Sequence, residues 1–409
     1  MAATSSAATH SNAAASSSSS LPSTKGPSSS SSPSSSSKAA PALSEPVTLT
    51  APYLATFRPA KVYSYSRKPD SQITSLCYDD RGQLVLSSSS DETLHIYDCI
   101  TGKHVHETVS NKYGCHLARF THHSSSVIYA STKQDETIRY HSVHHNSYLQ
   151  YFRGHTGKVV GLEMSPVDDT FLSAAVDDSV RLWDLRSPTS QGHLNLKGHP
   201  VVAYDLTGKV FAIALNQRSA ILLYDTRKFD QAPFLTIHLD DTRALSQISM
   251  PPRYPIITSL EFNNEGGHLL VGTSGDVHYV VDSFSGAILH RLVGHSGLEN
   301  ASGAPIGMVP EAGISGAEVC WTSDGKLVLA GSANGQIVVW KIPDEPQQQQ
   351  QQGQQGYPAG GDIPNLNPTT VIPGHEGPVR CLAFSPRLAQ LTTGSSQLVL
   401  WLPEPPSDI

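Results

Sequence analysis

Residues 154–186 read GHTGKVVGLEMSPVDDTFLSAAVDDSVRLWDLR, and the rest of the chain repeats this stretch with variations. Apolar and polar residues alternate in three short runs, residues 159–164, 170–174 and 180–184, as they do in half-buried β-strands. Turn-forming residues separate the runs, first a Ser-Pro pair followed by two Asp and then a second Asp pair. The stretch therefore predicts a small antiparallel sheet.

A Gly-His pair opens this stretch and a Trp-Asp pair closes it. These pairs are the signature of a WD repeat, which forms one four-stranded blade of a β-propeller. A single blade cannot bury its apolar faces, so copies must stack around an axis. Seven positions can be aligned with the Trp of this repeat: Tyr97, Tyr140, Trp183, Tyr224, Val281, Trp340 and Trp401. The sequence predicts an all-β fold, a seven-bladed WD-repeat β-propeller.

The spacing of these markers shows where the repeats are interrupted. The first three intervals match the usual repeat of about 40–45 residues. The last three are longer, and we assign the excess to inserts at residues 240–255, 296–314 and 344–368, the last of which contains PQQQQQQGQQGYPAGG. Because the entropy of closing a loop grows slowly with its length, we expect a surface loop without a fixed structure there.

The remaining segments define the domain organisation. Residues 1–46 are almost entirely Ser, Ala, Thr and Pro, which predicts a disordered tail. The propeller is expected over residues 53–403, followed by a short C-terminal tail at 404–409. The last blade supplies only three strands, whereas residues 60–65 form an alternating strand before the first blade. We therefore expect residues 60–65 to complete the last blade, because a closed ring leaves no bare edge there.

Composition excludes several classes of protein. A formal net charge of −7 argues against a main task of coating nucleic acid, and we expect no sequence-specific nucleic-acid binding. The five cysteines are scattered without a C-x-x-C pair, and Cys77, Cys320 and Cys381 fall in the first strand of their blades. We expect buried free thiols and no zinc site. No apolar run approaches 18 residues, so we expect a soluble intracellular protein without a membrane partner.

The repeat at residues 154–186 contains candidates for all four members of a buried hydrogen-bonded tetrad: His155, Ser173, Asp177 and Trp183. The same residue types also resemble a Ser-His-Asp catalytic set. A structural network is favoured because the Trp takes part, the motif recurs, and no G-x-S-x-G elbow is present. Other blades keep part of the set: Asn334 stands at the turn of blade six, Ser395-Ser396-Gln397 at that of blade seven, and blade one has Asp91 without a Gly-His pair.

Other candidate chemistry has a simpler interpretation. The histidine pairs at 122–123 and 144–145 lie in predicted turns without Cys or carboxylate at ligand spacing, so we interpret them as solvated turn residues. No Walker loop, HExxH or dinucleotide fingerprint is present. We expect a non-enzymatic protein with no cofactor and no metal.

The sequence offers one candidate for partner binding, in blade two. Lys112, Tyr113, Lys133 and Arg139 lie close together in sequence, and basic side chains beside a Tyr can receive a phosphorylated or acidic peptide. An ordinary solvated charged face is the alternative for each of these residues.

Several stretches go beyond a generic propeller. They include NKYG (111–114), DETIRY (135–140), MSPVDDTF (164–171), VRLWDLRSP (180–188) and the segment around YDTR (224–227). From about residue 57 to 403 the chain resembles the small WD-repeat subunit of the COMPASS histone H3 lysine methyltransferase complex. That subunit is shared with RNA 3′-end processing and phosphatase assemblies. The Ser-rich tail, the Gln-rich insert and residues 296–314 depart from the family.

The resemblance implies a nuclear, non-enzymatic scaffold of a histone H3 lysine 4 methyltransferase complex. Its partners would be a SET-domain methyltransferase, other COMPASS subunits and the phosphorylated C-terminal domain of transcribing RNA polymerase II. The alternative is a subunit of the mRNA cleavage and polyadenylation machinery that uses the same propeller. An enzyme and a substrate receptor of a ubiquitin ligase are further hypotheses.

Overall fold

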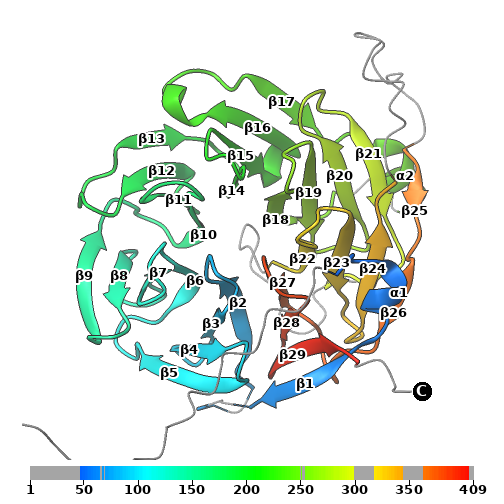
Figure 1. Ribbon diagram of the computed structural model, residues 1–409. Helices are drawn as coiled ribbons and strands as arrows, with labels where there is room; N and C mark the ends of the chain where they lie inside the picture. Colours follow the sequence, from blue (N-terminus) through cyan, green and yellow to red (C-terminus); the bar gives the residue numbers. More distant parts are fainter. Residues whose placement is uncertain are drawn as a thin grey trace, which may run out of the picture. The chain divides into compact units, whose positions relative to one another are not determined.

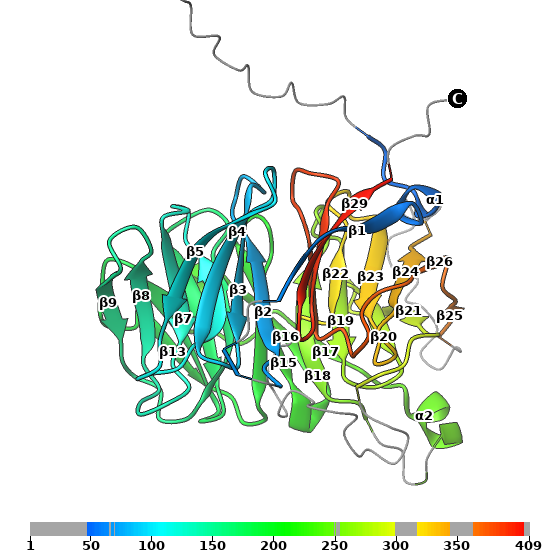
Figure 2. The same cartoon turned by 90° about the horizontal axis from the view of Figure 1, so that it is seen from below.

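The computed structural model describes residues 47–64, 67–68, 70–248, 250, 254–298, 317–343 and 363–404. Within these residues, seven β-sheets stand around a central channel (Figure 1), and Figure 2 shows the same ring from its edge. The prediction of a seven-bladed all-β propeller is confirmed. The predicted tail at 1–46, the last five residues and most of the Gln-rich insert lie outside the described residues.

Each of the first four blades is a sheet of four consecutive antiparallel strands. The first strand of each blade lies next to the channel and the fourth lies at the rim. Blade one comprises β2 (Ile73–Tyr78), β3 (Leu84–Ser89), β4 (Thr93–Asp98) and β5 (Lys103–Val109). Blade two comprises β6 (His116–Phe120), β7 (Ser126–Ala130), β8 (Ile138–Ser142) and β9 (Ser147–Phe152). Blade three comprises β10 (Val159–Met164), β11 (Thr170–Ala175), β12 (Ser179–Asp184) and β13 (Gly192–Asn195). Blade four comprises β14 (Pro200–Tyr204), β15 (Val210–Leu215), β16 (Ala220–Asp225) and β17 (Leu235–His238), with two 3-10 turns, η1 (Asn216–Arg218) and η2 (Thr226–Lys228).

The inserts change the later blades. Blade five comprises β18 (Ile257–Phe262), β19 (His268–Thr273), β20 (His278–Asp282) and β21 (Ile288–Leu292), and blade six comprises β22 (Val319–Trp321), β23 (Leu327–Gly331), β24 (Ile337–Lys341) and β26 (Thr370–Ile372). The first insert forms helix α2 (Thr242–Ile248). The third returns as β25 (Asn365–Leu366), which pairs in parallel with β21 as a fifth strand of blade five. The expectation that this insert has no fixed structure is therefore wrong for its last residues.

Blade seven joins the two ends of the propeller. Its strands are β27 (Cys381–Phe384), β28 (Leu391–Gly394), β29 (Leu398–Pro403) and, at the rim, β1 (Phe57–Tyr63). β1 pairs antiparallel with β29, so the predicted closure of the ring is confirmed, although the strand lies a few residues earlier than 60–65. The register shifts between Pro59 and Lys61. Such a bulge on an edge strand is where a proline, which has no N–H to donate, is tolerated.

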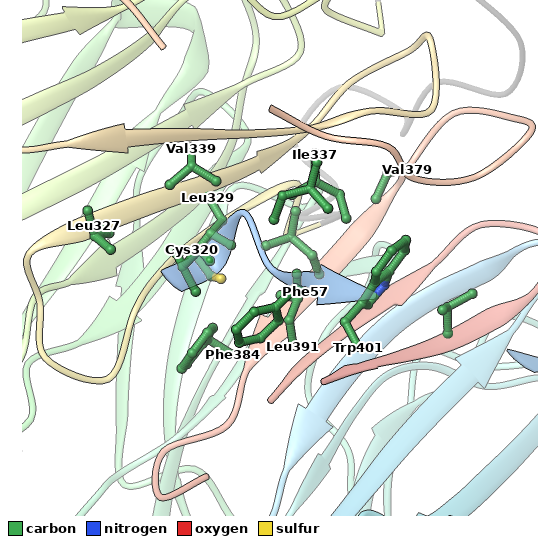
Figure 3. Packing of buried hydrophobic residues seen from close by; sticks show 14 of the residues in the cluster. Phe57, Cys320, Leu327, Leu329, Ile337, Val339, Val379, Phe384, Leu391 and Trp401 are labelled. Atoms are coloured by element: carbon green, nitrogen blue, oxygen red, sulfur yellow. The ribbon is translucent and has the colours of Figure 1, made fainter. Parts of the chain in front are cut away.

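The hydrophobic core of the described residues is divided into seven clusters, each of which lies between two neighbouring blades. Figure 3 shows the cluster between blades six and seven, where Phe57 of β1 lies near Phe384 and Leu391. Helix α1 (Ala51–Leu54) buries Leu54 in the same cluster, beside blade six. The core is therefore the set of blade-to-blade interfaces, as expected of sheets that cannot bury their faces alone.

One of the seven sequence markers is misplaced. Trp183 pairs with Phe171, the second residue of β11, and packs in the cluster between blades two and three. In blade two the residue with this register is His141, because it pairs with Val127, the second residue of β7. Tyr140 points the other way, into the cluster with blade three. The assignment of Tyr140 as a marker is wrong by one residue, and a shift of one residue along a strand reverses the face of a side chain.

The cysteines follow the sequence prediction. All five are free, and four of them are buried, while Cys77 is partly buried. Cys77, Cys320 and Cys381 lie in the innermost strands of blades one, six and seven. Among the described residues, no helix has the length and apolar character needed to span a bilayer.

The closing strand gives a direct test of the ring. We expect Phe57→Ala to lower the free energy of unfolding by about 3–5 kcal/mol, because the Phe57 side chain is fully buried between blades six and seven. Val62→Ala on the same strand is the control, since Val62 is 48% exposed and its loss should cost under about 0.5 kcal/mol. Equal effects of the two substitutions in urea denaturation would show that β1 does not hold the ring closed.

Candidate functional site

The structure brings the four tetrad residues of blade three together. The fully buried Ser173 hydroxyl accepts the indole N–H of Trp183 at 2.8 Å and lies 2.6 Å from Nε2 of His155. Nδ1 of His155 lies 3.3 Å from the Asp177 carboxylate, which also accepts the backbone N–H of Thr156 at 2.8 Å. The chain of contacts runs from the turn before β10 through β11 to β12, so it ties three parts of one blade together.

The environment of the tetrad sets its protonation. Burial lowers the pKa of His155 below its usual value, although the contact with Asp177 opposes this shift. Burial by itself would raise the pKa of Asp177, but hydrogen bonds from His155, Ser179 and the Thr156 N–H outweigh it and hold that pKa well below its ordinary range. A catalytic serine must reach a substrate, whereas the Ser173 oxygen is enclosed and occupied by the Trp183 N–H. The geometry favours a structural network over a hydrolytic site.

Blade seven retains three of the four members. His375 Nε2 lies 2.7 Å from the Thr393 hydroxyl, which accepts the indole N–H of Trp401, also at 2.7 Å. Burial lowers the pKa of His375 to about 4. A threonine thus serves here where blade three has a serine.

Blade six replaces the strand hydroxyl by Ala330, so its tryptophan needs another acceptor. Trp340 donates its indole N–H to the backbone carbonyl of Val293 at 3.0 Å. His295 stacks on His278 with ring centroids 4.0 Å apart and contacts the Gly275 carbonyl at 3.0 Å. Backbone carbonyls therefore take the place of the strand hydroxyl as partners of Trp340 and His295 in blade six.

We predict that Ser173→Ala lowers the free energy of unfolding by about 1–3 kcal/mol, because it leaves the buried Trp183 N–H and His155 Nε2 without a partner. Ser173→Thr keeps a hydroxyl, as Thr393 does in blade seven, and should lose less. The exposed Ser323→Ala is the surface control. The two Ser173 variants should differ in chemical denaturation; if they lose the same stability, the hydroxyl is not what holds the blade.

Among the blade two candidates, Arg139 is enclosed by aromatic side chains. The guanidinium of Arg139 lies 3.6 Å from the centroid of the Tyr113 ring and within 6 Å of the rings of Tyr148 and Tyr151. It pairs with the Asp135 carboxylate at 3.0 Å, and its side chain is only 2% exposed. The expectation that Arg139 offers its charge to a partner is therefore corrected, because the charge is enclosed by tyrosines and neutralised within the blade.

The two lysines of the group differ. Lys133 reaches the Glu92 carboxylate of blade one at 2.6 Å, where Lys68 also binds at 2.7 Å. Lys112 is exposed, with its ammonium 5.0 Å from the Tyr113 ring centroid and with no ion pair among the described residues. Of the four predicted residues, Lys112 and Lys133 are exposed, Tyr113 is half-buried and Arg139 is buried, and Lys112 is the exposed cation without an ion pair among the described residues.

The histidine pairs behave differently from one another. His122 is not a solvated turn residue: it contacts the Asp80 carboxylate at 2.9 Å and the Asp168 carbonyl at 3.1 Å, and so links turns of blades one and three. His144 and His145 are exposed and pack edge to face. Within the part of the chain that the structure describes, no three His, Cys, Asp or Glu residues are grouped as a metal site would need.

Sequence reasoning missed a pocket in blade four, of about 480 Å³. Its lining residues come from the β14–β15 turn, the end of β16 and the segment that leads to β17: Lys209, Val210, Asp225, Arg227, Lys228, Gln231, Ala232 and Phe234. The signal in the sequence was the group of cations and aromatic residues around YDTR, but nothing in it showed that they surround a cavity.

The innermost strands carry charged side chains. Arg119 of β6 pairs with Glu163 of β10 at 2.7 Å. On β18, burial raises the pKa of Glu261 to about 8, although the backbone N–H of Trp321 binds its carboxyl group at 3.2 Å.

Glu261 should make stability depend on pH. Because its pKa is raised in the folded state, the carboxyl contributes stability at low pH that is lost as the pH rises from about 4.5 to about 8. Relative to Glu261→Gln, the wild type should lose about 1.4 kcal/mol for each pH unit in this window. Urea denaturation at pH 6 and pH 7 measures the difference, with Glu376→Gln at an exposed site as the control. Parallel pH profiles of the free energy of unfolding for the wild type and Glu261→Gln would contradict this prediction.

Comparison with known proteins identifies the family. The WD domain, G-beta repeat model matches residues 146–184, 314–341 and 366–401, and the Anaphase-promoting complex subunit 4 WD40 domain model matches residues 54–123. The Set1 complex component swd2 of Schizosaccharomyces pombe is 36% identical, over 87% of this chain and 99% of its own length. The chain belongs to the family of this WD-repeat protein.

Two further relatives of this family match over a similar extent. WD repeat-containing protein 82 of Drosophila melanogaster is 35% identical over 85% of this chain and 95% of its own. The COMPASS component SWD2 of Saccharomyces cerevisiae is also 35% identical, with the same coverage of both chains. The similarity therefore spans nearly the whole of each relative rather than a few repeats.

Proposed function

We propose that this protein is a non-enzymatic scaffold subunit of a Set1/COMPASS-type histone H3 lysine 4 methyltransferase complex in the nucleus. The observation that carries the proposal is the match to nearly the full length of relatives named as Set1 complex and COMPASS components. The buried and fully bonded Ser173 supports a role without catalysis. A rigid ring with loops on two faces is suited to holding several partners at once.

We further propose that the scaffold couples the methyltransferase to transcribing RNA polymerase II through its phosphorylated C-terminal domain. The support is the family resemblance of the blade two and blade three sequences, together with the exposed cation of Lys112 beside Tyr113. In this proposal Arg139 and Lys133 act indirectly: Arg139 fixes the ring of Tyr113, and Lys133 neutralises Glu92 next to the site.

The decisive experiment is purification of the tagged full-length protein from its own cells, followed by mass spectrometry. We expect a SET-domain methyltransferase with its partner subunits, and histone H3 lysine 4 methyltransferase activity in the eluate. In the same purification, Lys112→Glu should reduce recovery of phosphorylated polymerase without losing the methyltransferase, whereas the exposed Lys326→Glu in blade six should change neither.

The other outcomes are equally informative. Recovery of cleavage and polyadenylation factors without a methyltransferase would replace the proposal by a role in mRNA 3′-end processing. Recovery of neither would show that this chain does not share the function of its relatives. Unchanged recovery of polymerase with Lys112→Glu would remove the blade two site while leaving the scaffold proposal intact.

A further inference from the structure

Backbone hydrogen bonds connect the segments that line the blade four pocket. The N–H of Thr226 donates to the Lys209 carbonyl at 2.9 Å, and the N–H of Gln231 donates to the Lys228 carbonyl at 3.0 Å. On the rim side, the N–H of Phe234 donates to the Leu223 carbonyl at 3.0 Å. Backbone hydrogen bonds therefore hold the main chain of all three lining segments. The pocket's volume of about 480 Å³ is in the range of ligand-binding pockets.

Cations outnumber acids among the residues that line this pocket. Lys209, Arg227 and Lys228 are exposed, and none of them has an ion pair among the described residues. One acid, Asp225, lines the pocket, and its carboxylate accepts the backbone N–H of Arg227 at 2.9 Å. Three cations at one pocket of a protein whose net charge is −7 mark a site for an anionic group.

The same pocket also has an aromatic side chain, Phe234, that is left exposed. Phe229 packs on Phe211 with ring centroids 5.9 Å apart and lies directly over Gly192, so it anchors the segment to the blade. Phe234, five residues later, is 59% exposed at the pocket. A large aromatic ring left in water beside a pocket is typical of a surface that binds a partner.

We propose that this pocket binds an acidic peptide segment of a partner protein, with an apolar side chain placed against Phe234 and carboxylates placed against Lys209, Arg227 and Lys228. A peptide with carboxylates fits better than a phosphate, because the Asp225 carboxylate lies in the wall and would repel a doubly charged group more strongly. A nucleic-acid strand would need a basic track longer than one pocket. The proposal goes beyond the scaffold function and holds whichever complex contains the chain.

Fluorescence anisotropy with the purified full-length protein tests the proposal. The probe is a labelled synthetic peptide in which one Phe lies between runs of Asp and Glu. We expect saturable binding that weakens as salt is added, because the contacts are between exposed charges. The double variant Arg227→Glu, Lys228→Glu should weaken binding at least ~10-fold, and Phe234→Ser by about fivefold.

Matched controls keep the test specific. Phe284 is 80% exposed in blade five and Lys326 is exposed in blade six, so Phe284→Ser and Lys326→Glu should each change the affinity less than about twofold. Urea denaturation of each variant checks that the fold is kept.

Four results would overturn the proposal: no binding of the acidic peptide, equal loss in the control variants, tighter binding of a matched phosphoserine peptide, or tighter binding of a single-stranded RNA of equal charge. Each is read on the isolated protein. Failure here therefore leaves the scaffold proposal standing, and failure to recover a methyltransferase from cells leaves this one standing.

Discussion

The antiparallel pairing of β1 with β29 is the constraint on which the propeller depends. β1 is a single rim strand, but its two buried ends serve two interfaces: Phe57 packs between blades six and seven, and Tyr63 packs between blades seven and one. The Tyr63 ring lies 4.4 Å from that of Tyr97 in blade one. Five of the seven interfaces join blades that follow one another entirely within residues 73–372, whereas the two interfaces of blade seven need residues from both ends of the chain. The ring is therefore complete only when residues far apart in sequence meet, which carries the entropic cost of a long loop closure.

The parts of the fold that could be predicted from sequence are those that depend on local alternation. Strands such as β10 and β15 are short runs rich in apolar residues with turn residues at both ends, so their bounds follow from the chain itself. β25 could not be predicted, because its two residues form a strand only against the open edge of β21. The position of His141 was missed for a related reason. An aromatic Tyr140 fits the pattern of the marker, and only the register with β7 shows that His141 occupies that place.

The candidate sites also differ in how far they could be predicted from the sequence. The tetrad of blade three was predictable because its members stand at fixed offsets from the Gly-His and Trp-Asp pairs, which the strand geometry brings together. The blade two group was not, because sequence proximity does not say whether a cation is solvated. Arg139 is buried because Tyr113, Tyr148 and Tyr151 close around it, and two of these come from β9, the next strand along. In blade four the cations could be identified from the sequence. The packing of Phe229 against Phe211, which positions their segment, could not.

Blade four shows how stability and recognition are separated in this molecule. It lacks the polar tetrad, and its interface with blade three is held by aromatic packing, with Tyr224 stacked on Phe211 at 5.3 Å and Phe229 added at the edge. Because Phe229 anchors the segment after β16, the neighbouring Arg227, Lys228 and Phe234 are not needed for folding and stay in solvent. The same nine-residue segment thus turns one phenylalanine inward and leaves another outward. A blade that relies on apolar packing can present its loop cations to a partner, whereas in blade two Arg139 lies within strand β8, where tyrosines enclose it and Asp135 pairs with it.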